Sequence, residues 1–189
     1  LIGYDDVISH GGVKAGDAGT RNNFGFNVKY NKSGKNLQGN INTIVRRMEG
    51  GVLHYYQVKG NVMTSLAVQP STAGGTATFN GKASIQDITD PLNVIAVDGN
   101  ATLQVEMTDN GEPGSADMIG ITVWNKSGGL WFASNWNGAK TTQKILAGGN
   151  IKVSGGSVNA RQATEEVIPA EELALYVVIA PNPAANQVK

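Results

Sequence analysis

Phe24-Gly25-Phe26-Asn27-Val28-Lys29-Tyr30 is the stretch of sequence that decides the fold. Large apolar residues occupy every second position, and Gly, Asn and Lys stand between them. Because successive side chains of an extended strand point to opposite faces of a sheet, this alternation predicts a half-buried β-strand. The turn-forming residues Asn31–Gly34 follow, and Leu37–Val45 alternates again. We therefore expect a β-hairpin at this place.

The same two-residue alternation recurs along the chain as far as residue 154. Turns rich in Gly, Asn and Asp separate the alternating segments, and no alternation of strands with helices appears. Strands joined by short turns are typical of antiparallel sandwiches and barrels. We expect an all-β fold, an antiparallel β-sandwich of the jelly-roll-like or Ig-like kind with a C-terminal linker and tail. The further candidate strands are residues 53–59, 62–68, 77–87, 101–108, 118–125, 129–135 and 150–154.

The composition excludes several classes of protein. The 189 residues include no cysteine, which excludes a disulfide scaffold, a thiolate zinc site and a cysteine nucleophile. Fifteen basic and fifteen acidic residues give no net charge, so we expect no nucleic-acid partner. No apolar run of about twenty residues occurs, so we expect no transmembrane segment. The first residue is Leu1 and not Met, which favours a fragment or processed form of a longer protein.

The character of the sequence changes after the last alternating segment. We predict a β-sandwich domain over residues 1–155, with its boundary near Gly155–Arg161. Residues 156–172 are polar and then acidic, which is typical of a linker. Residues 173–189 begin with an apolar run and form a separate C-terminal segment.

The loop Asp109–Asp117 has two interpretations. As a plain connection between strands, its Asn and Gly residues supply the positive φ angles of a turn, and Pro113 fixes a second bend. As a metal site, it would offer calcium the hard oxygen ligands that this ion prefers. Asp87 and Asp90, in another loop, either add ligands or initiate a turn. The candidate calcium ligands are Asp109, Asn110, Glu112 and Asp117.

Trp131 and Trp136 are candidate ligand-binding residues. The strand expected over residues 129–135 places Leu130 and Phe132 on one face and Trp131 on the opposite, polar face. An exposed tryptophan at such a place is able to stack on a sugar ring. The alternative is core packing, since tryptophan is highly buried on average.

No group of residues marks a catalytic site. The two histidines, His10 and His54, have no acidic residue or cysteine at ligand spacing, and we expect His54 to be a hydrogen-bonded strand residue. The sequence contains neither a G-x-S-x-G nucleophile elbow nor a P-loop. We therefore predict that the chain is not an enzyme, and calcium is the one cofactor that the sequence suggests.

Pro181-Asn182-Pro183 follows the apolar run Leu175–Ala180. This segment resembles the opening of the C-terminal sorting domain of type IX secretion cargo in Bacteroidetes. Only the first residues of such a signal are present, over residues 173–189. The resemblance implies that the type IX secretion machinery recognises the tail. It also implies a location outside a Gram-negative bacterium, either secreted or on the outer cell surface.

A second resemblance rests on the stretches Phe24–Tyr30, Gly39–Ile41, Asp109–Gly114, Asp117–Trp124 and Gly148–Ile151. Residues 1–155 look like a β-domain that occurs near the C-terminus of large secreted Bacteroidetes proteins, sometimes labelled post-COAP. The resemblance brings no catalytic residues. It implies a structural spacer or adhesin-type module, with a glycan or a surface protein as candidate partner. The alternative is a carbohydrate-binding module that accompanies a secreted hydrolase.

Overall fold

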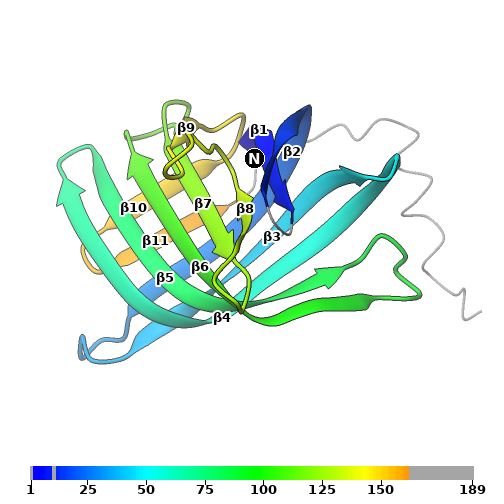
Figure 1. Ribbon diagram of the computed structural model, residues 1–189. Coiled ribbons are helices and arrows are strands. Elements are labelled where there is room, and N and C mark those ends of the chain that lie inside the picture. The colour runs from blue at the N-terminus through cyan, green and yellow to red at the C-terminus, as the bar shows by residue number, and fades with distance from the viewer. Residues whose placement is uncertain (1, 10–11, 162–189) are drawn as a thin grey trace, which may run out of the picture.

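The computed structural model describes residues 2–9 and 12–161, and this part of the chain forms an 11-stranded sheet without any helix (Figure 1). No helix that could span a membrane therefore occurs among these residues. The strands are β1 (Ile2–Ser9), β2 (Gly12–Tyr30), β3 (Leu37–Glu49), β4 (Val52–Ser71), β5 (Gly74–Asp87), β6 (Ile95–Asp109), β7 (Met118–Trp124), β8 (Leu130–Ala133), β9 (Lys144–Ile145), β10 (Asn150–Ser154) and β11 (Ser157–Arg161).

The strands pair in the order β10-β11-β2-β3-β4-β5-β6-β7-β8, with β1 added to β2 and β9 added to β7. Every one of these pairs is antiparallel, which confirms the predicted all-β antiparallel fold. β10 also contacts β4, β5 and β6 without pairing with them. The sheet therefore curves until β10 and β11 lie across from its middle strands (Figure 1). The strands form one continuous curved sheet, and the predicted sandwich packing is not confirmed.

The core lies on the concave face of this sheet. Every second side chain of β5 is buried, which is the alternation that the sequence predicts for a strand with one face inside. Phe24 and Phe26 of the first quoted stretch are buried in β2, and Phe26 packs edge to face on Phe79 with 5.3 Å between ring centroids. Each such buried side chain contributes about 1.5–3 kcal/mol through the hydrophobic effect. The largest fully buried side chains are Trp131, Phe79, Phe132, Ile41, Ile85, Leu103, Met107, Ile119 and Ile121.

Two glycines turn the chain between β3 and β4. Gly50 and Gly51 have φ angles of 58° and 85°. Such left-handed values are unfavourable for residues with a Cβ, and a two-residue hairpin turn of type I′ requires them at both positions. The turn pairs Glu49 with Val52 and thereby fixes the register of the whole hairpin. This register decides which residues of β3 and β4 reach the concave face.

The sheet continues beyond residue 155 to the far end of the predicted boundary region, Gly155–Arg161. β11 pairs with both β10 and β2, so the fold reaches at least as far as Arg161. The remainder of the predicted linker and the predicted sorting segment, residues 162–189, lie outside the described residues.

Candidate functional site

Asp109 and Asp117 hold the outer edge of β10. A carboxylate oxygen of Asp109 accepts a hydrogen bond from the main-chain amide of Val153 at 2.8 Å. A carboxylate oxygen of Asp117 accepts one from the main-chain amide of Ile151, also at 2.8 Å. Both aspartates are buried, and charge-assisted hydrogen bonds of this kind are stronger than neutral ones. These two carboxylates and two amides are called the edge clasp below.

The register of the β10–β11 hairpin explains why these two amides need partners. Ser154 pairs with Ser157 across a two-residue turn, so alternate residues of β10 point their amides away from β11. Ile151 and Val153 are residues of this kind. At the edge of a sheet such amides are open to water or to a strand from another chain. The edge clasp satisfies them within the molecule.

The second oxygen of each carboxylate holds the loop between β6 and β7. Asp109 accepts the amide of Gly111 at 2.8 Å, and Asp117 accepts the amide of Asn110 at 2.9 Å. All four carboxylate oxygens therefore accept a main-chain amide. The loop and the edge of β10 are fixed to each other by the same two side chains.

The structure brings the four predicted calcium ligands into one loop and engages them in hydrogen bonds. Asn110 Nδ2 donates to the main-chain oxygen of Ala116 at 2.6 Å, and Asn150 Nδ2 donates to Glu112 Oε2 at 3.0 Å. In the part of the chain with described side chains, no group of three or more His, Cys, Asp or Glu is placed to hold a metal ion. Asn150 Oδ1 is buried and accepts no hydrogen bond. Calcium binding in this loop stays a prediction.

Asp87 and Asp90 are too distant to join this loop. Asp109 lies opposite Gly75 at one end of β5, whereas Asp87 is the last residue at the other end of the same strand. The interpretation of Asp87 and Asp90 as additional calcium ligands is therefore wrong. The turn interpretation is confirmed for Asp90, whose carboxylate accepts the amide of Leu92 at 2.9 Å.

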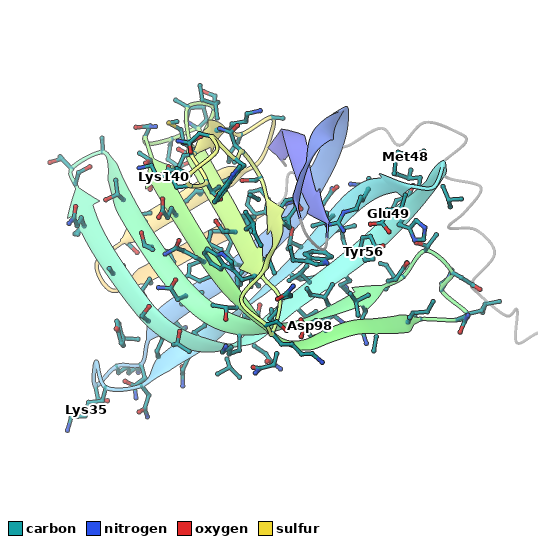
Figure 2. All side chains as sticks on the ribbon, viewed as in Figure 1. Lys35, Met48, Glu49, Tyr56, Asp98 and Lys140 are labelled. Carbon is teal, nitrogen blue, oxygen red and sulfur yellow. The ribbon has the colours of Figure 1, made fainter. Side chains whose placement is uncertain are left out.

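A second polar cluster lies on the concave face, where the β3–β4 hairpin projects from the sheet (Figure 2). Arg47 is only 3% exposed, and its guanidinium lies over the rings of Trp131 at 4.6 Å and Tyr56 at 5.2 Å. Arg47 Nη2 donates to the main-chain oxygen of Trp131 at 3.0 Å, and Nη1 donates to Glu49 Oε1 at 3.0 Å. Arg47 thus ties β3 to β8, two strands that are far apart in the order of the sheet.

Tyr56 and His54 extend this cluster from β3 across β4 to β5. The Tyr56 hydroxyl donates to Glu49 Oε2 at 3.1 Å, and the His54 ring stacks on the Tyr56 ring at 5.8 Å. His54 Nδ1 lies 2.7 Å from Asp87 Oδ2, and Asp87 Oδ1 accepts the amide of Thr89 at 2.9 Å. The expectation that His54 is a hydrogen-bonded strand residue is confirmed. The set Arg47, Glu49, His54, Tyr56 and Asp87 is called the open-end network below.

These contacts shift the pKa values of the open-end network. Burial is the largest influence on Glu49 and on Asp87, and alone it would raise both carboxyl pKa values. For Glu49, hydrogen bonds from Arg47 and Tyr56 and the charge of Arg47 outweigh it, so the pKa is lowered from 4.5. Hydrogen bonds from Thr89 and His54 likewise lower the pKa of Asp87 from 3.8. Burial, followed by the charge of Glu49, raises the pKa of the Tyr56 hydroxyl above its ordinary value of 10.

Sequence reasoning missed the open-end network, although part of its signal was present. The alternation that puts Val45 on the concave face continues through Arg47 and Glu49. Two charged residues therefore fall at positions that the pattern assigns to the interior. Their partners come from β4, β5 and β8, and one strand's pattern carries no information on which strands become its neighbours.

The two predicted tryptophan sites differ in their burial. Trp131 is 2% exposed and packs edge to face on Tyr56, with 5.5 Å between ring centroids. This burial favours the core-packing interpretation over an exposed sugar platform. Both Trp131 and Phe132 are buried, so β8 has no polar face of the kind expected there. Trp136 is half-buried in the segment after β8, where it bridges to Thr141.

His10 and the segment Pro181–Pro183, which were singled out in the sequence, lie outside the described residues. No family model, curated protein or solved structure matches the chain.

Proposed function

We propose that the chain is a non-catalytic module of a larger exported protein, and that it serves as a structural spacer or adhesin-type domain on the outer surface of a Gram-negative bacterium. The observation that carries this proposal is the use of three of the four aspartates that are buried among the residues with described side chains. Asp98, Asp109 and Asp117 each accept two main-chain amides. A buried carboxylate engaged in this way satisfies the backbone. It therefore serves the fold and is not presented to a substrate.

The arrangement of the core supports the same proposal. A single cluster of buried apolar residues includes side chains from β2 to β11. Loops at the two ends of such a rigid body are the usual places for contacts with other molecules. A carbohydrate-binding module has less support, because Trp131 contributes to the core and is not free to stack on a sugar.

The tail supplies the proposed route to the surface. Pro181-Asn182-Pro183 after an apolar run is the feature that supports recognition by the type IX machinery. We expect a reporter to be exported when it is fused to residues 156–189 extended to a complete sorting domain, in a cell with type IX secretion. The matched control carries alanine at Pro181, Asn182 and Pro183. Retention of the unaltered fusion in the periplasm would contradict the proposed route.

A further inference from the structure

Exposed apolar side chains gather at one end of the molecule. Seven large hydrophobic residues are exposed in the part of the chain with described side chains, and five of them lie on two neighbouring hairpins. Surface patches of this kind usually mark a place where another segment or molecule binds. The five residues are Met48, Val52, Leu92, Val94 and Ile95. Met48 precedes Glu49, the partner of Val52, and Val94 precedes Ile95, so these two project from the other face, and the open-end surface below consists of Val52, Leu92 and Ile95.

The turn that carries Leu92 is held in one conformation. Asp90 accepts the amide of Leu92 through its side chain at 2.9 Å and the amide of Asn93 through its main-chain oxygen at 3.0 Å. Leu92 is 90% exposed, so these bonds hold the backbone of a turn that presents an apolar side chain to water. A preformed contact of this kind binds with less loss of conformational entropy than a loose one.

Two members of the open-end surface face the open-end network. Val52 lies opposite Glu49 in the β3–β4 ladder, and Ile95 lies opposite Asp87 in the β5–β6 ladder. Residues opposite each other in a ladder project from the same face of the sheet. An occupant that covers Val52 and Ile95 therefore also lies over the His54–Asp87 pair. Figure 2 shows Glu49 and Met48 on the projecting β3–β4 hairpin, where they are successive residues of β3 and project from opposite faces.

The chain itself leaves the sheet in the direction of this surface. β11 runs antiparallel to β2, and Ala160 lies opposite Phe26, which in turn lies opposite Ile41 of β3. β11 therefore runs the same way as β3, towards Glu49 and the hairpin tip. With about 3.3 Å per residue along a strand and about 4.8 Å between strands, the tip is roughly 30 Å from the end of β11.

The sequence after β11 is able to cover that distance and has the right chemistry. The eleven residues 162–172 reach about 36 Å when fully extended. They are followed by Leu173–Ile179, an apolar segment with Leu, Leu, Val and Ile at alternate positions. A tether of this length keeps the segment at a high effective concentration near the surface.

We propose that the segment Leu173–Ile179 of this same chain packs against the open-end surface. The contact would cover Val52, Leu92 and Ile95 and would fix the tail relative to the sheet. This inference goes beyond the proposed function. It concerns a contact within the chain, so its test does not depend on whether the tail is an export signal.

The experiment compares two valines of equal exposure in the full chain. Val52 and Val62 are both 54% exposed, but only Val52 belongs to the open-end surface. Amide hydrogen exchange of residues 173–179 is measured by mass spectrometry in the native chain, in Val52→Asp and in Val62→Asp. We expect the native segment to be protected at least about tenfold over a free peptide. Val52→Asp should remove this protection, and Val62→Asp should leave it unchanged.

Two further variants test the same contact in case Val52→Asp misfolds. Leu92→Ser alters a fully exposed side chain and should also lower the protection, while Val177→Asp should do so from the tail side. Exchange of residues 173–179 at the free-peptide rate in the native chain would overturn the proposal. So would protection that Val52→Asp and Leu92→Ser both leave intact. Protection that rises with protein concentration would show that a second copy is the occupant, and would likewise overturn it.

Discussion

The edge clasp and the open-end network are both built from buried charged residues, but they use their charges differently. In the edge clasp, Asp109 and Asp117 bind only main-chain amides, and every carboxylate oxygen has such a partner. In the open-end network, most partners are other side chains, and Arg47 also lies over two aromatic rings. Both regions contain carboxylates, but the partners of the carboxylates in the edge clasp are main-chain amides, which do not titrate.

This difference indicates separate roles for the two ends of the molecule. The edge clasp closes the last strand of the sheet and leaves its outer amides unavailable to other chains, as natural sheets commonly require. The open-end network is partly exposed and adjoins the apolar residues of the open-end surface. The first region fixes β10 to the loop between β6 and β7. The second contains Glu49 and Asp87, whose lowered pKa values make its contribution to stability depend on pH.

The largest effect is expected from Asp117→Ala. This change leaves the amides of Asn110 and Ile151 without their acceptor, and Ile151 is completely buried. Loss of two charge-assisted bonds, one of them to a buried donor, should lower the free energy of unfolding by about 3 kcal/mol. Urea denaturation at pH 7 measures this. Asp90→Ala, which removes one exposed bond to Leu92, is the control and should cost less than about 1 kcal/mol.

Calcium and a chelator separate the two interpretations of this loop. If Asp117 acts through amides alone, the loss in Asp117→Ala is the same with added calcium and with chelator. A native protein that calcium stabilises, together with an Asp117→Ala variant that does not respond, would show that the loop is a metal site. Equal stability of Asp117→Ala and the native protein would contradict the structural role.

A smaller effect, at acid pH, is expected from the open-end network. The pKa values of Glu49 and Asp87 are lower in the folded protein than their ordinary values, so the unfolded chain takes up protons first. Their contribution to stability is therefore present at neutral pH and is lost as the pH falls below about 4. Asp87→Asn does not titrate and should lose less stability than the native protein between about pH 5 and pH 3.

Urea midpoints measured at several pH values test this expectation. Glu49→Gln should likewise reduce the fall of the urea midpoint as the pH is lowered from about 5 to about 3. If the urea midpoint falls equally with pH in the native protein and in both variants, the result would contradict the lowered pKa values.

The elements that local pattern determines were predictable from the sequence. The alternation at Phe24–Tyr30 gives a strand with one buried face wherever that strand is placed. Asp109 and Asn110 were recognisable as turn residues, because such side chains bind nearby main-chain amides. The β-hairpin expected after Phe24–Tyr30 is confirmed, because β2 pairs with β3 across the turn residues Asn31–Gly34.

The elements that depend on the curvature of the sheet were not predictable from the sequence. Asp109 meets Val153 only because β10 lies over the middle of the sheet, 44 residues further along the chain. Trp131 was assigned to a polar face by alternation, yet it is buried because Arg47 and Tyr56 lie against it. Long-range contacts of this kind follow from the closing of the sheet, and no local pattern encodes them.

The most direct test of the central claim is hydrogen exchange of two amides on the outer edge of β10. The claim is that the buried carboxylates of Asp109 and Asp117 serve the backbone, so the amides of Ile151 and Val153 should exchange slowly in the native protein, although no strand among the described residues pairs with that edge. Asp117→Ala should release Ile151, and Asp109→Ala should release Val153. If both amides already exchange in the native protein as fast as exposed main-chain amides, the carboxylates do not hold them, and the structural role assigned to these aspartates is wrong.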